Sequence, residues 1–276
     1  MNSSWTSKSL IPLSAFFLIG CTVGQASGPD TKPAASRQAV IVELFTSEGC
    51  SSCPPADALL KELSETQPVS GAQIVALEEH VDYWNQLGWS DPFSSEQYSF
   101  RQNEYASKFG NGSSYTPQMV VDGSKEFVGS RSREARATIE EAAHQMKTQV
   151  SVRELTSERA GSRALEIAIP ASADAASKQG DIWLAVTESG LQSAVKAGEN
   201  SGETLQHAPV VRVLRKVGDF RRQDGAKLQS NVTLEKKWRS ENVSIVVFLA
   251  DKHDGKIFGA SFLELGDAQT RKMSQP

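Results

Sequence analysis

Cys50 and Cys53 are the side chains of this sequence whose type and spacing are best suited to chemistry. Two residues separate them, so the pair can interconvert between a dithiol and a disulfide. Pro54 and Pro55 follow at once, and proline is favoured in the first turn of a helix. A thiol at a helix start faces unsatisfied backbone N–H groups and the positive end of the helix dipole, which both favour the reactive thiolate. We expect Cys50 to be the exposed nucleophile and Cys53 to be the resolving thiol.

The residues around the pair predict a strand, a tight loop and a helix that hold it. Residues 40–45 form a short apolar, β-rich run before the loop, and an apolar helical stripe follows at residues 56–63. Residues 73–78 predict a second strand, parallel to the first across a right-handed crossover. The carboxyl ends of parallel strands meet at one edge of the sheet. The loop that begins at His80 should therefore lie beside the cysteine loop.

After that second strand, His80 and Asp82 have three candidate roles. They could shuttle protons to Cys53. His80 could instead join the two thiolates as a metal ligand. Both residues could also anchor their loop by hydrogen bonds, which is the commonest role for a single histidine in a loop. Glu48, in the cysteine loop itself, is a further candidate for a supporting residue.

These motifs resemble those of the thioredoxin superfamily. More narrowly, the chain resembles an uncharacterised family of secreted bacterial thioredoxin-like proteins, domain of unknown function 1223. The resemblance covers nearly all of the chain beyond its N-terminal segment, and it implies a thioredoxin-like fold and thiol–disulfide exchange without a cofactor. It supplies no mechanism for Gly198-Glu199-Asn200 or His207, where loop anchoring is favoured over ligand binding. The matching stretches are residues 42–57, 80–84, 115–118 and 198–200, together with His207.

The resemblance also implies that Thr116 and Pro117 form a cis-proline loop that faces Cys50. Cis X–Pro bonds are rare, but this proline stands directly before a β-rich run, which is where the family has it. In that place the backbone of Thr116 could pair with an extended substrate segment. The alternative is a trans proline at the start of an edge strand.

The pattern of residues 39–148 predicts an α/β thioredoxin-like domain in the order βαβ–α–ββα, a mixed sheet with flanking helices. Its second helix is expected at residues 95–109, capped by Ser94. Arg101 on this helix is predicted to belong to a packing face and to be tied to a loop; a lid beside the redox site is the alternative. The last three elements are expected to be a proline-led strand with a turn at residues 115–123, a short strand at residues 126–128 and a helix at residues 133–147.

From residue 149 onwards the pattern is one of strands. Short pieces alternate apolar and polar residues, as at residues 210–217, and no periodicity of helical length competes with them. This predicts an antiparallel, β-sandwich-like C-terminal domain at residues 149–276.

The N-terminus predicts export. Residues 1–20 carry one basic side chain and an apolar core too short to span a membrane, as in a secretory signal. The segment ends in Leu-Ile-Gly-Cys21, which resembles a bacterial lipobox and implies a lipid on Cys21; cleavage after Ala26 is the alternative. No aspartate follows Cys21, which favours anchoring to the outer membrane on its periplasmic side. Residues 1–21 are thus predicted to be a lipoprotein signal segment and residues 22–38 a flexible tether.

Charge and cysteine content exclude two classes of protein. The chain has 276 residues, a formal charge of −4 and a pI near 5.7, so no basic surplus exists to neutralise nucleic-acid phosphates. Of its three cysteines, Cys21 belongs to the export segment. One remaining pair excludes a framework of several structural disulfides.

The sequence predicts a thiol–disulfide oxidoreductase of the cell envelope, acting with a redox partner on an unknown protein or small-thiol substrate. One rival is a Cu(I)- or Zn-handling protein that uses Cys50 and Cys53 with His80 or Met119, although no methionine cluster supports it. The other rival is a non-catalytic binding module whose disulfide is a relic.

Overall fold

The computed structural model describes residues 37–157, 161–172 and 179–266, which belong to one compact unit. The predicted signal segment, Cys21 and nearly all of the predicted tether lie outside the described residues. The elements of the N-terminal half are β1 (Gln38–Thr46), α1 (Pro54–Thr66), β2 (Ala72–His80), η1 (Asn85–Leu87), α2 (Glu96–Phe109), β3 (Gln118–Val121), β4 (Lys125–Val128) and α3 (Ser132–Ala143). Those that follow are β5 (Ser151–Leu155), β6 (Ser162–Ile169), β7 (Gln179–Glu188), β8 (Gln192–Ala194), β9 (Thr204–Gln206), β10 (Val210–Arg221), β11 (Ala226–Thr233), η2 (Ser240–Asn242), β12 (Val243–Asp251) and β13 (Ile257–Glu264).

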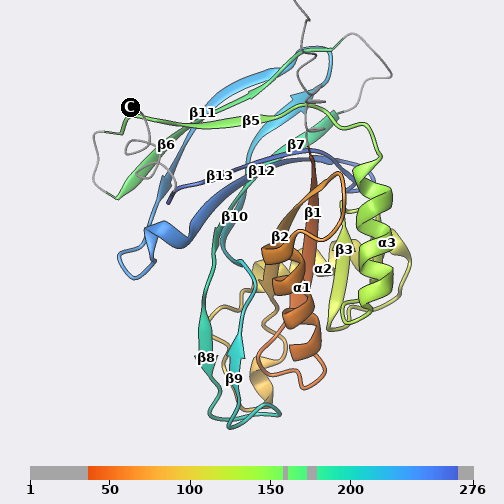
Figure 1. Cartoon of the computed structure of the whole chain (residues 1–276), viewed down its shortest axis with the longest axis vertical. Coiled ribbons are helices and arrows are strands. Elements are labelled where there is room, and N and C mark those ends of the chain that lie inside the picture. Colours follow the sequence, from red (N-terminus) through yellow and green to blue (C-terminus); the bar gives the residue numbers. More distant parts are fainter. Residues whose placement is uncertain (1–36, 158–160, 173–178, 267–276) are drawn as a thin grey trace, which may run out of the picture. The chain divides into compact units, whose positions relative to one another are not determined.

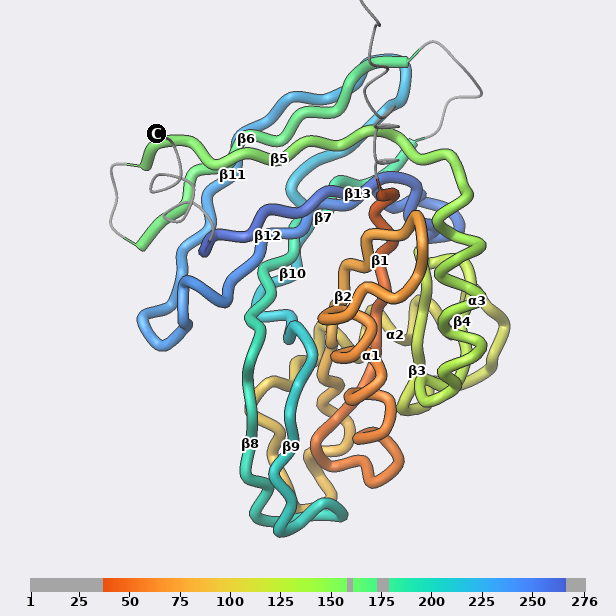
Figure 2. The backbone as a smooth tube through the Cα atoms, in the orientation of Figure 1, coloured from red at the N-terminus to blue at the C-terminus, as the bar shows by residue number. Residues whose placement is uncertain are grey.

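A mixed sheet is the centre of the fold (Figures 1 and 2). Among the described residues, eight strands join it in the order β13-β12-β7-β10-β2-β1-β3-β4. β1 and β2 run parallel, and β3 lies antiparallel to β1 on its other side. The predicted element order of residues 39–148 is confirmed.

The start of α1 is fixed by local sequence. Pro54 and Pro55 occupy its first positions and Cys53 is its N-cap residue, so the cysteine loop leads directly from β1 into the helix. Leu60 and Leu63 on its buried face pack in one core cluster with side chains of β1. Burial of each such side chain stabilises the fold by roughly 1.5–3 kcal/mol. The loop is therefore held between two well-packed elements.

The boundaries of α2 and α3 differ from the prediction, and α3 begins at Ser132 instead of residue 133. Ser95 caps α2 by accepting a hydrogen bond from the Gln97 N–H, whereas the Ser94 hydroxyl donates to the carbonyl of Asp91. Helix α3 ends at Ala143 instead of continuing to Lys147. Lys147 leaves the helical path and forms a buried ion pair of 2.6 Å with Asp122.

Helix α2 presents a packing face, as expected. Its Arg101 is buried, but it binds the Glu43 carboxylate of β1 at 2.6 Å and is not tied to a loop as predicted. The Tyr105 hydroxyl donates to the second oxygen of the same carboxylate at 2.7 Å. A charged pair therefore joins α2 to the centre of the sheet.

The strands after residue 149 extend the same sheet. β7, β10, β12 and β13 belong to it, and β10 joins it through a parallel pairing in which Val210 is opposite Glu78 of β2. One core cluster contains Ile41 and Leu77 from the first half and Val211 and Phe248 from the second. The change of pattern near residue 149 is thus a change of element type within a shared core.

The other strands of the second half form two smaller sheets. In the described part of the chain β11, β6 and β5 make a three-stranded sheet, and its buried side chains share a core cluster with those of β7 and β12. β8 and β9 form a hairpin that reaches toward the lower end of the view in Figure 1, with β9 beside α1. None of the helices among the described residues is long and apolar enough to cross a membrane.

Candidate functional site

The sulfurs of Cys50 and Cys53 form a disulfide, with the two Cα atoms 5.4 Å apart. The Cys53 N–H donates to the Cys50 carbonyl at 3.1 Å, which places Cys50 one turn before α1. Both cysteines are 0% exposed, whereas Ser51 and Ser52 between them are exposed. The prediction of an exposed Cys50 nucleophile is therefore wrong for the oxidised protein, because neighbouring loops cover the sulfurs.

Two hydroxyl groups lie against the Cys50 sulfur. The Thr116 Oγ1 donates to Cys50 Sγ at 3.3 Å, and the Ser52 Oγ lies 3.3 Å from the same atom. The Trp84 indole N–H donates to the Thr116 Oγ1 at 2.9 Å, so the hydroxyl proton of Thr116 is directed at the sulfur. The Thr116–Pro117 bond is cis, as predicted. The His80–Trp84 loop and the cysteine loop are neighbours, also as predicted.

The loop between β8 and β9 closes over the cysteine loop. The Asn200 side-chain amide donates to the carbonyls of Glu48 at 2.9 Å and Cys50 at 3.0 Å. The Ser51 N–H donates to Glu199 Oε2 at 3.0 Å, and hydrogen bonding from Ser51 lowers the pKa of the Glu199 carboxyl. Loop anchoring, the favoured hypothesis for this stretch, is confirmed for Glu199 and Asn200.

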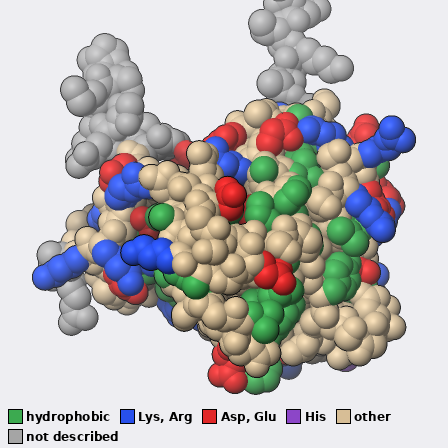
Figure 3. All heavy atoms as spheres, turned by 90° about the horizontal axis from the view of Figure 1, so that it is seen from below, with side chains coloured by type: hydrophobic (Ala, Val, Ile, Leu, Met, Phe, Trp, Pro, Cys, Tyr) green, Lys and Arg blue, Asp and Glu red, His purple; other side chains and the backbone are tan. Residues whose placement is uncertain are grey.

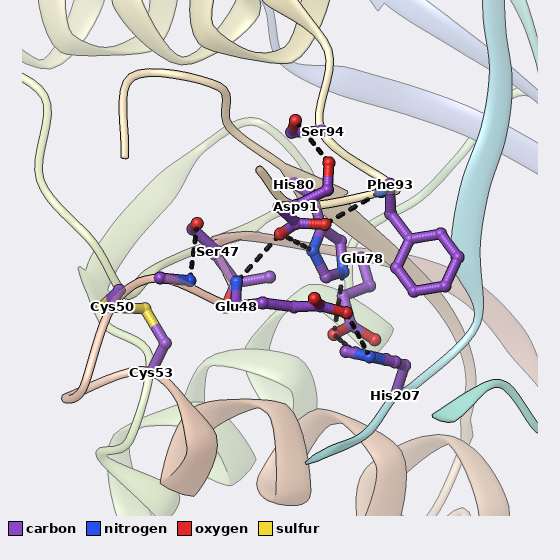
Figure 4. Close-up of polar contacts among 12 residues, drawn as sticks. Ser47, Glu48, Cys50, Cys53, Glu78, His80, Asp91, Phe93, Ser94 and His207 are labelled. Carbon is purple, nitrogen blue, oxygen red and sulfur yellow. Dashed lines mark hydrogen bonds and ion pairs between the residues drawn. A yellow bond between two sulfur atoms is a disulfide. The ribbon is translucent and has the colours of Figure 1, made fainter. Parts of the chain in front are cut away.

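A buried cluster of histidines and carboxylates lies beside the cysteine loop (Figure 4). His80 Nδ1 is 2.7 Å from Asp91 Oδ2, and His80 Nε2 is 3.3 Å from Glu78 Oε1. His207 Nδ1 is 3.2 Å from the same Glu78 oxygen, and its Nε2 is 3.1 Å from Glu48 Oε1. Figure 4 shows the Glu48 side chain running from the cysteine loop to the histidines.

Four segments of the chain bring this cluster together: the cysteine loop, β2, the segment between η1 and α2, and the connection between β9 and β10. Glu78 and His80 alternate along β2 and so project to one face of the sheet, while His207 comes just before β10. Burial alone would lower the pKa of His80, but Asp91 and Glu78 raise it well above its usual value. Burial likewise opposes the charge on His207, but Glu48 and Glu78 raise its pKa to about 9.

Asp57 is a further buried acid of the site, in the first turn of α1. Its Oδ1 accepts a hydrogen bond from the Thr46 hydroxyl at 2.6 Å. Burial, and after it the charge of Glu78, raises the pKa of Asp57 to about 8. A carboxyl group that titrates near neutral pH thus stands one turn from Cys53.

The other predicted site residues have anchoring roles. Asp82 accepts a hydrogen bond from the Ser99 hydroxyl and so ties its loop to α2. Glu48 Oε2 accepts from the Trp89 indole N–H at 2.7 Å. His80 faces Asp91 and Glu78. Among the described residues, one group of side chains lies closely enough to hold a metal ion: Glu78, His80 and His207. The predicted metal set of Cys50, Cys53 and His80 is not the one brought together.

Sequence reasoning missed Glu78, Asp91 and Asp57 as site residues. One signal was available for Glu78, since it stands at the end of an otherwise apolar strand. A carboxylate in a buried strand is costly unless it has a partner. Its partner His207 is remote in sequence, so no local pattern could identify it.

Comparisons with known proteins place the chain among relatives. A family model described as "Protein of unknown function (DUF1223)" matches residues 41–250. A search of the curated proteins found no match. A crystal structure of an Agrobacterium tumefaciens protein is 27% identical with a TM-score of 0.63, and the match covers 84% of this chain and 96% of that one. HBP35 of Porphyromonas gingivalis, 12% identical with a TM-score of 0.59, covers 84% of this chain and 76% of its own, which shows a likeness of fold alone.

Proposed function

The chain belongs to the DUF1223 family, and we propose that it is a thioredoxin-like thiol–disulfide oxidoreductase that acts through Cys50 and Cys53. The description of the family names no activity, so the proposal rests on the site. Its support is the pair of hydroxyl groups, from Ser52 and Thr116, at 3.3 Å from Cys50 Sγ. A hydrogen bond to a charged group contributes about 1.5–3 kcal/mol. Donation by Thr116 therefore stabilises a thiolate on Cys50.

The exchange proceeds in two balanced steps. A substrate thiolate attacks Cys50 Sγ, a substrate–Cys50 disulfide forms, and the Cys50–Cys53 bond breaks to release Cys53 as a thiolate that takes up a proton. A second substrate thiolate then attacks the substrate sulfur of the mixed disulfide. It expels the Cys50 thiolate, and the substrate leaves oxidised by two electrons. The reduced pair reduces a substrate disulfide by the same steps in reverse, and a redox partner restores the starting state.

Access to Cys50 requires a movement of the covering side chains. The Trp84 side chain packs on Gly49, and the β8–β9 loop binds the backbone of Cys50 and Ser51. Next to Trp84, Tyr83 is 37% exposed and Leu87 in η1 is 54% exposed. Figure 3 shows, on the lower end of the molecule, hydrophobic side chains at the surface among acidic ones, with lysine and arginine toward the edges. A substrate that binds over Tyr83 and Leu87 would displace Trp84 or the β8–β9 loop from the cysteine loop as it binds.

The place of action is part of the proposal. The lipobox-like Leu-Ile-Gly-Cys21 sequence supports export and a lipid on Cys21. The lipid would hold the domain at the outer membrane on its periplasmic side. In such an oxidising compartment a cysteine pair of this kind needs a dedicated partner to change its redox state.

A redox titration of the purified protein tests this function. The protein is equilibrated in buffers of reduced and oxidised glutathione, and its free thiols are then alkylated. Mass spectrometry measures the fraction of the protein in which Cys50 and Cys53 carry the alkyl group. A reversible two-electron transition at a potential above about −300 mV supports the oxidoreductase, since structural disulfides lie below that value. A pair that stays oxidised in every buffer until the protein unfolds supports the non-catalytic module and ends the proposal.

A further inference from the structure

We propose that Glu78, His80 and His207 bind a divalent transition-metal ion, with Zn²⁺ as the first candidate. This site contains no thiol and differs from the metal set predicted from the sequence. It goes beyond the proposed redox function and stands or falls without it.

Polar atoms of this cluster are buried without hydrogen-bond partners. Glu78, His80 and His207 are each at most 1% exposed. Glu78 Oε2, His80 Nε2, His207 Nε2 and Glu48 Oε1 have no hydrogen bond among the described residues. His80 Nε2 and His207 Nε2 do lie 3.3 and 3.1 Å from carboxylate oxygens, but without hydrogen-bond alignment. Such buried atoms are costly unless something binds them.

Asp91 fixes one proton of His80 on Nδ1, so the other ring nitrogen, Nε2, is the candidate metal ligand. Asp91 accepts hydrogen bonds from the N–H groups of Glu48 and Phe93, each at 2.9 Å, and so presents a fixed carboxylate to His80 Nδ1. A carboxylate holds the proton on the nitrogen that it faces. Metal binding would displace the second proton of His80, and the lone pair of Nε2 would then point into the cluster. A histidine whose outer nitrogen donates to a carboxylate is the usual arrangement around protein metals.

His207 has the matching arrangement. Its Nδ1 is hydrogen-bonded to Glu78 Oε1, the oxygen that His80 Nε2 also approaches, and its Nε2 faces Glu48 Oε1. A metal ion would take the place of the proton in this hydrogen bond. We assign Nδ1 as the ligand and Glu48 as the carboxylate on the outer nitrogen. Both histidines then have an acidic partner behind them, Asp91 for one and Glu48 for the other.

The distances suit a tetrahedral ion. Ligands at 2.0–2.1 Å from zinc are separated by roughly 3.4 Å. His80 Nε2 and His207 Nδ1 lie 3.3 and 3.2 Å from Glu78 Oε1, and one ligand atom from each of the three residues falls within 4.8 Å of the others. The third separation, between the two histidine nitrogens, must shorten by at most about 1.4 Å to reach the tetrahedral value. His207 lies in the connection between β9 and β10, and a change in its side-chain torsion angles would supply this shift while its backbone N–H keeps its hydrogen bond to the Leu191 carbonyl.

Three protein ligands of this type, two histidines and a glutamate, leave a fourth position for water. The ion would join β2 to the segment before β10. Through Glu48 it would also be linked to the cysteine loop. Its binding would therefore stabilise the contact between the two halves of the chain.

Binding of Zn²⁺ and Co²⁺ to the metal-free, oxidised full chain tests the site. Calorimetry should show one Zn²⁺ per chain, and bound Co²⁺ should give the visible absorption of four-coordinate cobalt. His80→Gln and His207→Gln should weaken Zn²⁺ binding by at least about 100-fold, and Asp91→Asn by about 10- to 100-fold. His253→Gln, at an exposed position, is the matched control and should bind as the parent does.

A Cys50→Ser/Cys53→Ser variant separates this site from one built on thiolates. It should keep full Zn²⁺ affinity, and X-ray absorption of the zinc-loaded parent should show N and O ligands near 2.0–2.1 Å and no sulfur near 2.3 Å. The parent measurement needs no variant, so it decides even if a histidine variant does not fold. Absence of stoichiometric binding, a sulfur ligand, or unchanged affinity in His207→Gln would each overturn the proposal. A pair of protonated histidines without metal would then explain the cluster.

Discussion

The side-chain amide of Asn200 donates a hydrogen bond of 3.0 Å to the backbone carbonyl of Cys50, which lies 150 positions earlier in the chain. The same amide also satisfies the carbonyl of Glu48. Asn200 is buried, so neither carbonyl is turned to bulk water at this point. The conformation of the cysteine loop thus depends on a side chain from the β8–β9 hairpin.

Replacing Asn200 by Asp should loosen this loop. Aspartate keeps the shape but has no N–H to donate, and two carbonyls then face a carboxylate. We expect a loss of about 1–3 kcal/mol in the free energy of unfolding and faster reduction of the disulfide by dithiothreitol. Asn231→Asp, at an exposed position of β11, is the control. Equal reduction rates in parent and variant would contradict the role of Asn200 as a cover.

Replacing Thr116 by Val should raise the pKa of the Cys50 thiol in the reduced protein. Valine keeps the shape and removes the O–H that donates to the sulfur. The loss of about 1.5–3 kcal/mol corresponds to a rise of roughly 1–2 pKa units. Thiolate absorbance against pH measures it. Thr138→Val, at a buried hydroxyl with no hydrogen bond among the described residues, should leave the titration unchanged.

Asp57 should make stability depend on pH. Its usual pKa is 3.8, and in the folded protein burial and then Glu78 raise it to about 8. The folded state binds this proton more tightly, so the stabilising contribution is complete below about pH 4 and is lost as the pH rises through about 8. The free energy of unfolding of the metal-free protein, measured with urea, should fall by a few kcal/mol between about pH 5 and pH 8, at about 1.4 kcal/mol per pH unit. Asp57→Asn should reduce this slope, most clearly below about pH 6.5, because above it the raised pKa values of His80 and His207 contribute in the same direction. The exposed Asp224→Asn should retain the full slope.

Removing Arg101 should be strongly destabilising. Arg101→Met leaves the buried Glu43 carboxylate without its cation, which costs about 3–5 kcal/mol. A Glu43→Gln/Arg101→Met variant should recover part of this, because it removes both charges. Arg131→Met breaks an exposed pair with Glu134 and should change stability by less than about 1 kcal/mol. If denaturant titrations gave similar losses in the free energy of unfolding for Arg101→Met and Arg131→Met, the buried pair would contribute no more to stability than the exposed one.

The lipid anchor is tested by fractionation. The parent chain should partition with the outer membrane, and Cys21→Ala should appear in the soluble periplasmic fraction. The lipid itself is detected by mass spectrometry of the N-terminal peptide. A parent chain that is soluble and begins at Ser27 would show that cleavage follows Ala26 and that no lipid is attached.

Local features of the site could be predicted because neighbouring residues encode them. The apolar run of β1, the cysteines and the two prolines fix the loop and the start of α1 without help from distant segments. The position of Thr116 opposite Cys50 was implied by the family resemblance and not by a local pattern, and in the structure the antiparallel pairing of β3 with β1 places it there.

The buried cluster and the covered disulfide could not be predicted in this way. Both depend on segments beyond residue 190: His207 reaches Glu78 only because β10 pairs with β2, and Cys50 is covered in part by the Asn200 loop. The sequence indicates that these segments form strands and turns, but strand pairing across long separations leaves no local pattern. The prediction of a β-sandwich-like domain at residues 149–276 did not anticipate the shared sheet for the same reason.

The parallel pairing of β10 with β2 also has a consequence for how the chain is made. β2 is an interior strand in the finished sheet, with β1 on one side and β10 on the other. A nascent chain that has folded its first half still presents the second side of β2 as an open edge with unpaired backbone groups. Open edges are templates for aggregation, and pairings between distant segments form slowly. If the chain crosses a membrane before it folds, the open edge of β2 does not form during synthesis. It forms after the crossing instead, and a chaperone that covers strand edges would shorten the time for which β2 is unpaired.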